Sequence, residues 1–217
     1  MDVSDVEEEY TARLDDIAIN ECCCLVYTSG TVGKPKGVML NHDNLTWDAY
    51  TIGCRLENLQ MGNEVLISYL PLSHVAAQIV DIFMTLSFAC TIYFADKDAL
   101  KGSLVKTLSE VSPTRFLGVP RVYEKIQEKM IAVGAQSGPL KRFISNWAKG
   151  VTLQHYLDRM EGKPNNSLQY KLVKNFFLAK VKSTLGLSRC VSMVSAAAPI
   201  SPDVKKCKIV ILICNSL

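Results

Sequence analysis

The chain alternates between short apolar runs and longer segments in which apolar residues recur at helical spacing. Short apolar runs bounded by turn residues are typical of buried strands, and recurrence every third to fourth position is typical of amphipathic helices. We predict strands over 22–28, 64–70, 90–94, 115–119 and 190–195. We predict helices over 43–59, 76–87, 100–111 and from Pro120 onward, and a largely helical, basic region over 139–185 broken by a loop at 162–166. This alternation predicts an α/β fold with a mostly parallel sheet flanked by helices.

Composition and charge divide the chain into three parts, namely an acidic segment over 1–21, the α/β region over 22–203, and a tail over 204–217 that is lysine-rich and then apolar. The 217 residues are 48% hydrophobic and 21% charged, which excludes an intrinsically disordered chain. No apolar run reaches the roughly 18 residues of a membrane-spanning helix, and the acidic start is unlike a secretory signal. The eight cysteines include no Cys-x-x-Cys pair, so we interpret them as buried, reduced thiols of a cytoplasmic protein.

The strongest chemical signal is the loop that follows the first predicted strand. Residues 27–38 read Tyr-Thr-Ser-Gly-Thr-Val-Gly-Lys-Pro-Lys-Gly-Val. Glycines permit close approach of a ligand to the backbone, and the hydroxyls, free amides and lysines suit phosphate oxygens. The order of residues fits neither the Walker pattern nor the dinucleotide-binding pattern, so neither a P-loop NTPase nor a Rossmann oxidoreductase is indicated. By composition alone, an ordinary turn remains the alternative.

As a literal string, this loop resembles the signature of the adenylate-forming (AMP-dependent synthetase and ligase) superfamily, except that Val32 stands where that family has Thr. Three further segments are similar to family motifs: Leu-Pro-Leu-Ser-His at 70–74, Gly-Val-Pro-Arg-Val-Tyr-Glu-Lys at 118–125, and Ser-Ala-Ala-Ala-Pro-Ile-Ser at 195–201. In the last of these, Ala196 stands where the family usually has Gly. The details most resemble the bubblegum subgroup of long-chain fatty acyl-CoA synthetases, over about residues 22–203.

The resemblance implies activation of a fatty acid with ATP to an acyl-adenylate, followed by transfer to coenzyme A, with Mg²⁺ as the metal. It assigns the β- and γ-phosphates to Thr28, Ser29, Gly30, Thr31 and Gly33. It makes Thr28 the hydroxyl ligand of Mg²⁺, Lys36 the positive charge near pyrophosphate, and His74 a hydrogen-bond donor near the carboxylate and the α-phosphate. It places the adenine ring against Ala197, Ala198 and Pro199. Without the resemblance, Lys36 would be a solvated loop lysine and His74 a structural residue.

Other motifs of the family, including the second Mg²⁺ ligand, the ribose-binding Asp and the adenylation lysine, do not occur in the sequence, so we expect a partial copy of a ligase whose isolated activity is doubtful. The alternative is a non-catalytic nucleotide-binding or partner-binding product. The expected partners are fatty acid, ATP and coenzyme A, with no nucleic acid because no recognition motif accompanies the basic region. The basic stretch over 168–185, with Lys171, Lys174, Lys180 and Lys182, either contacts an anionic membrane, such as the endoplasmic reticulum, or is an ordinary surface helix.

Overall fold

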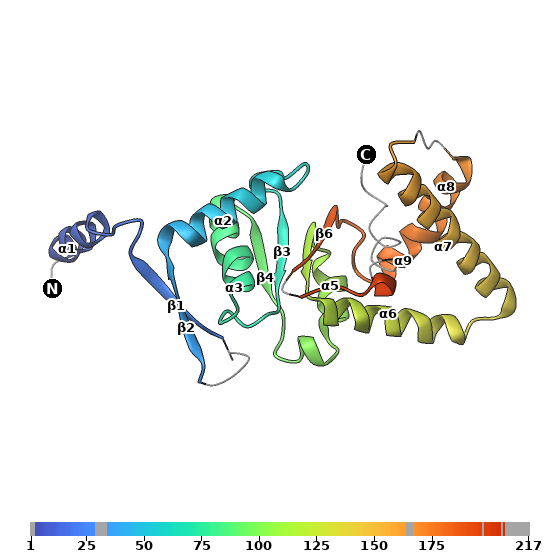
Figure 1. Ribbon diagram of the computed structural model, residues 1–217, viewed down its shortest axis with the longest axis horizontal. Helices are drawn as coiled ribbons and strands as arrows, with labels where there is room; N and C mark the ends of the chain where they lie inside the picture. Colours follow the sequence, from blue (N-terminus) through green and yellow to red (C-terminus); the bar gives the residue numbers. More distant parts are fainter. Residues whose placement is uncertain (1–2, 29–33, 164–166, 197, 205, 207–217) are drawn as a thin grey trace. The chain divides into compact units, whose positions relative to one another are not determined.

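The computed structural model covers residues 1–217 and describes all of them except 1–2, 29–33, 164–166, 197, 205 and 207–217. The described residues form two units (Figure 1). The first unit comprises Met1–Leu59 and Leu70–Phe88, and the second comprises Gln60–Tyr69 and Ala89–Leu217. Every helix in the described part of the chain is too short or too polar to cross a bilayer.

The first unit contains a two-stranded ribbon and helices, in the chain order α1 (Val3–Asp15), β1 (Cys22–Thr28), β2 (Lys36–Asn41), α2 (His42–Arg55), α3 (Val75–Ala77), the π-helix η1 (Gln78–Met84) and α4 (Thr85–Ser87). Strand β1 has the predicted bounds, but it pairs with β2 in an antiparallel ribbon that the sequence did not indicate. The prediction that β1 is buried is wrong, because its side chains are exposed or only half-buried. The interpretation of the cysteines as buried thiols is also wrong for Cys22, Cys23 and Cys54, which are exposed.

Helix α2 begins directly after β2 and packs against the helical segment that runs from Val75 to Ser87. Its N-cap is Asn41, and the side chains of Asn41 and Asn44 each accept a hydrogen bond from the other's backbone amide. Farther along α2, the ring of Phe88 lies against Gly53, where a Cβ atom would come within 2.0 Å of the ring. The Phe88 ring also stacks on Tyr50 with a centroid separation of 5.9 Å. A glycine therefore lets this helix approach its neighbour closely.

The second unit contains the parallel strands, in the chain order β3 (Val65–Ser68), β4 (Thr91–Phe94), the 3₁₀ turn η2 (Ala99–Lys101), α5 (Leu104–Val111), β5 (Arg115–Gly118), α6 (Pro120–Ala135), α7 (Pro139–Met160), α8 (Leu168–Leu172), the π-helix η3 (Val173–Leu178), α9 (Ala179–Thr184) and β6 (Ser192–Ser195). β3 pairs with β4 and β5 pairs with β6, both in parallel. The α/β prediction is therefore confirmed, with each strand within two residues of its predicted start and end.

Thr114, directly before β5, joins the two strand pairs at their amino-terminal ends. Its amide donates to the Val65 carbonyl at 3.0 Å, and its own carbonyl accepts from the Val191 amide at 2.8 Å. The Thr114 hydroxyl in turn accepts from the Val65 amide at 2.8 Å. Thr114 thus links the first residue of β3 to the residue directly before β6.

The core of the second unit lies between the strands and the helices α5 and α6. Its fully buried members include Leu108, Phe116 and Leu187. A separate small cluster joins α7 to α8 and η3 through Ala148, Tyr170, Val173 and Leu178. Two clusters in one unit mean that the α7–η3 helices stabilise each other locally.

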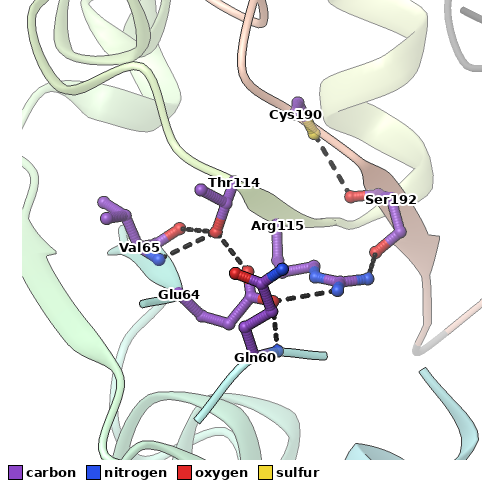
Figure 2. A network of polar contacts seen from close by, with 7 residues as sticks. All are labelled: Gln60, Glu64, Val65, Thr114, Arg115, Cys190 and Ser192. Carbon is purple, nitrogen blue, oxygen red and sulfur yellow. Dashed lines mark hydrogen bonds and ion pairs between the residues drawn. The ribbon is translucent and has the colours of Figure 1, made fainter. Parts of the chain in front are cut away.

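A buried polar network crosses the amino-terminal ends of β3, β5 and β6 (Figure 2). Arg115 forms an ion pair with Glu64 at 2.9 Å and donates to the Ser192 hydroxyl at 3.1 Å. The Thr114 hydroxyl donates to Glu64, and the Cys190 thiol donates to the Ser192 carbonyl. Burial raises the pKa of Cys190 to about 11, so this thiol stays protonated at neutral pH.

Candidate functional site

The two ends of the phosphate loop meet at the open end of the β1–β2 ribbon. Thr28, the last residue of β1, is the register partner of Lys36, the first residue of β2. The Thr28 hydroxyl donates to the Lys36 carbonyl at 3.4 Å, and both residues are exposed. The ribbon therefore brings the predicted Mg²⁺ ligand beside the predicted pyrophosphate-binding lysine.

The remaining residues assigned to the phosphates, Ser29, Gly30, Thr31 and Gly33, lie outside the described residues. Gly37 is described, and it faces Tyr27 across the ribbon. A Cβ atom at Gly37 would lie 3.3 Å from the Tyr27 ring, which is tighter than an ordinary contact. The glycine thus allows an aromatic ring to lie close to the backbone next to the loop.

His74 caps the helical segment that begins at Val75. Its Nδ1 accepts a hydrogen bond from the Ala76 amide at 3.2 Å, and its own amide donates to the Pro71 carbonyl at 2.9 Å. Since Nδ1 is the acceptor, the neutral imidazole carries its proton on Nε2. The structural role expected for a lone histidine is therefore filled by one ring nitrogen, and the other is a donor on an exposed side chain.

Gln78 connects β1 to the segment that carries His74, and the sequence prediction missed it. Its Nε2 donates to the Leu72 carbonyl at 2.9 Å, and its Oε1 accepts from the Cys24 thiol at 3.6 Å. The available signal was a neutral polar residue in the mostly apolar first turns of this helical segment. Such a residue often satisfies backbone groups of a neighbouring loop.

The segment assigned to adenine follows β6 in the second unit. Ala198 and Pro199 are exposed, Ile200 packs against the core, and Ala197 lies outside the described residues. Ala196 does not belong to the described non-glycine residues with positive φ, so alanine fits there without backbone strain. The hydroxyl oxygen of Ser195 is buried and has no hydrogen-bond partner among the described residues.

These features lie in two different units, the ribbon with His74 in the first and the 195–199 segment in the second. The family described as AMP-binding enzyme matches residues 2–214. This chain belongs to the AMP-binding enzyme family. The family resemblance inferred from the motifs is therefore confirmed.

Its curated relatives include long-chain-fatty-acid–CoA ligases. The chain is 52% identical to ACSBG2 of Xenopus laevis over 186 residues, which are 85% of this chain and 25% of that ligase. It is 42% identical to the ligase heimdall of Drosophila melanogaster over 207 residues, which are 94% of this chain and 30% of that ligase. The chain thus spans about a quarter of the length of these relatives.

Solved structures agree with the fold. The AMP complex of a carboxylic acid reductase didomain from Segniliparus rugosus matches with a TM-score of 0.56 and 26% identity, over 90% of this chain and 23% of that one. The adenylation domain of a carboxylate reductase from Mycobacterium chelonae matches with a TM-score of 0.54 and 18% identity, over 94% of this chain and 28% of that one. The predicted fold class, part of an adenylate-forming domain, is confirmed.

Proposed function

We propose that this chain provides part of the nucleotide-binding machinery of a long-chain fatty acid–CoA ligase. The observation that carries the proposal is the meeting of Thr28 and Lys36 at the end of the ribbon that holds the phosphate loop. A hydroxyl and an ammonium group at the two ends of a glycine-rich loop are suited to a triphosphate. The family membership and the names of the relatives support the same substrates: a fatty acid, ATP and coenzyme A.

In the proposed reaction, a carboxylate oxygen of the fatty acid bonds to the α-phosphorus of ATP and pyrophosphate leaves. The sulfur of coenzyme A then bonds to the acyl carbon and AMP leaves. The carboxylate is already ionised at neutral pH, so the protein needs no strong base, and its task is to orient groups and stabilise charge. Lys36 offsets negative charge on the departing pyrophosphate, and the Nε2 proton of His74 is available to an oxygen near the α-phosphorus.

Mg²⁺ fits this arrangement as a companion of ATP. Among the described residues no group of three or more His, Cys, Asp or Glu side chains is placed to hold a metal ion. Mg²⁺ is commonly held by one or two protein oxygens together with phosphate oxygens and water, and the exposed Thr28 hydroxyl is an oxygen of that kind. The ion would neutralise phosphate charge during the transfer.

The test is fatty-acid-dependent exchange of pyrophosphate into ATP. The host is the Xenopus laevis ACSBG2 ligase with its matched segment replaced by the corresponding residues of this chain, termed here the hybrid ligase. We expect the hybrid ligase to catalyse exchange and Lys36→Ala to lower the rate by about 100-fold, because a charge-stabilising group is lost. Lys129→Ala, which removes an exposed lysine of α6, is the matched control and leaves the rate unchanged.

A folded hybrid ligase without exchange, beside an active parent, would contradict the proposal. The 217-residue chain by itself is expected to give no exchange above background. The alternative, a nucleotide-binding or partner-binding module without catalysis, predicts ATP binding by the chain and an inactive hybrid ligase.

We also propose that this chain is cytoplasmic and that α8 and η3 contact an anionic membrane such as the endoplasmic reticulum. Leu168, Leu172 and Phe176 recur every four residues and are 75%, 56% and 76% exposed. Lys171 and Lys180 are exposed nearby. Lys182 is not part of this surface, contrary to expectation, because it is buried and donates to the Cys190 carbonyl at 3.2 Å. An apolar stripe flanked by lysines suits the interface of an anionic bilayer.

Co-sedimentation with vesicles tests the membrane contact. We expect binding to vesicles that contain phosphatidylserine, and a severalfold loss of binding when Leu172 and Phe176 are both changed to Ser, because the apolar stripe is removed. The matched control changes Leu140 and Phe143 of α7, each 72% exposed, to Ser. Equal loss in both double variants would indicate unspecific hydrophobic adsorption.

A further inference from the structure

A tyrosine hydroxyl from α6 holds the end of β6. Tyr123 lies in the first turn of α6 and is 2% exposed. Its hydroxyl donates to the Val194 carbonyl at 2.8 Å. Its ring meets Phe116 of β5 edge-on, with centroids 6.2 Å apart. The side chain therefore connects α6, β5 and β6 in the core of the second unit.

Gly118 creates the space that this ring occupies. A Cβ atom at Gly118 would lie 2.5 Å from Cζ of Tyr123 and 2.7 Å from its hydroxyl oxygen. Val119 is the N-cap of α6 and Pro120 its first residue, so the chain turns directly from the strand into the helix. This sharp turn places the fifth residue after the glycine back over the strand end. The spacing of glycine, proline and tyrosine in the segment Gly118–Lys125 thus has a geometric reason.

Val194 is the residue before the end of β6, and the proposed adenine-binding segment follows at once. At the other end of β6, Ser192 is held by Arg115. β6 is therefore fixed at both ends by side chains of its neighbours. Burial raises the pKa of Tyr123, so its hydroxyl stays protonated and remains a donor over the working pH range.

We infer that Tyr123 is a positioning residue for nucleotide binding, acting through the Val194 carbonyl on the described residues that follow it, Ser195, Ala196, Ala198 and Pro199. The inference rests on the proposed nucleotide-binding function and on the adenine-binding role that the family resemblance implies for that segment. Tyr123 need not touch the nucleotide, because the hydrogen bond fixes the carbonyl from which the segment departs. Loss of the hydroxyl leaves the ring and its contact with Phe116 in place, and it removes the hydrogen bonds of the hydroxyl to the Val194 carbonyl and to the Gly118 backbone.

Tyr123→Phe tests the inference with two readouts. In the hybrid ligase we expect the KM for ATP to rise about fivefold with kcat nearly unchanged, since a net hydrogen bond contributes about 1 kcal/mol and the loss concerns binding. In the 217-residue chain we expect amide hydrogen exchange over residues 192–201 to accelerate by a similar factor. Gly118→Ala displaces the same ring and is expected to produce both effects.

The matched control is Tyr170→Phe, which removes a hydroxyl from a buried tyrosine of the separate helical cluster. It is expected to change neither readout. If amide hydrogen exchange over 192–201 is unchanged in Tyr123→Phe, the inference is wrong. Faster amide hydrogen exchange without a change in the KM for ATP also overturns it. If the hybrid ligase itself proves inactive, the proposed function fails, and amide hydrogen exchange in the 217-residue chain still decides whether Tyr123 anchors β6.

Discussion

Replacing Gly186 with alanine is expected to lower the free energy of unfolding of the second unit by about 3 to 5 kcal/mol. Gly186 has a φ of +71° and ends α9. The Leu187 amide donates to the Lys182 carbonyl at 2.8 Å and the Gly186 amide donates to the Ser183 carbonyl at 3.1 Å, which is a Schellman cap. A Cβ atom at Gly186 would lie 2.2 Å from the backbone carbonyl carbon of Leu108. Two penalties therefore act together, an unfavourable backbone conformation and a collision with helix α5.

Gly162→Ala separates the two penalties. Gly162 also has a positive φ, +69°, but among the described residues no atom apart from those of its chain neighbours lies within 4 Å of the position of its Cβ. We expect a loss of about 1 kcal/mol, from the backbone conformation alone. Chemical denaturation of the 217-residue chain, followed by circular dichroism, measures both variants. Equal losses would mean that α5 moves away without cost and that the close approach at Gly186 does not matter.

The elements predicted correctly are those with a strong local signal. β1 was predicted with the bounds 22–28 because its apolar run is continuous, and α6 was predicted to begin at Pro120 because proline is favoured in the first helical turn. α1 was missed because its stability does not come from an apolar face. Its second half contains good helix formers, namely Glu, Ala, Arg and Leu, and Arg13 pairs with Glu9 at 2.7 Å, one turn earlier. β2 was missed because its own residues show no clear strand pattern, and only its pairing with β1 identifies it as a strand.

The candidate site also contains residues that the sequence indicates and residues that it does not. The order of residues in the loop indicated Thr28 and Lys36, and the structure adds that they face each other across the ribbon. The sequence did not reveal the contacts of Gln78, of Tyr123 or of the Glu64–Arg115 pair, because it does not show which distant residue a polar side chain will contact. The partners lie up to 71 residues away, as in the bond from Tyr123 to Val194. Only the fold brings such groups together.

Arg115→Met is expected to destabilise the second unit by about 3 to 5 kcal/mol at neutral pH, because it leaves a buried carboxylate without its counter-charge. The side chains of Arg115 and Glu64 are 4% and 5% exposed. The Gln60 amide also donates to Glu64 at 3.0 Å, which cannot replace a positive charge. Arg121→Met breaks the exposed pair with Glu124 and is the matched control, with an expected loss of at most about 1 kcal/mol.

The effect should depend on pH with a definite sign. Burial alone would raise the pKa of Glu64, but hydrogen bonds from Arg115 and Thr114 outweigh it and hold the pKa below the ordinary 4.5. A group whose pKa is lower in the folded state contributes stability that is fully present above 4.5 and is lost as the pH falls through the folded value. In Arg115→Met we expect the pKa of Glu64 to rise, because burial still acts on the carboxylate and only the weaker hydrogen bonds remain to oppose it.

The difference in unfolding free energy between the original chain and Arg115→Met should therefore be largest near pH 7 and shrink as the pH falls below 4.5, where Glu64 begins to bind a proton. Denaturant unfolding at several pH values measures this. The double variant Glu64→Leu, Arg115→Met should be more stable at pH 7 than Arg115→Met alone, because no charge then remains buried. If the difference does not change with pH and the double variant is no better, Arg115 acts through packing, and the charge of Glu64 plays no part in joining β3 to β5.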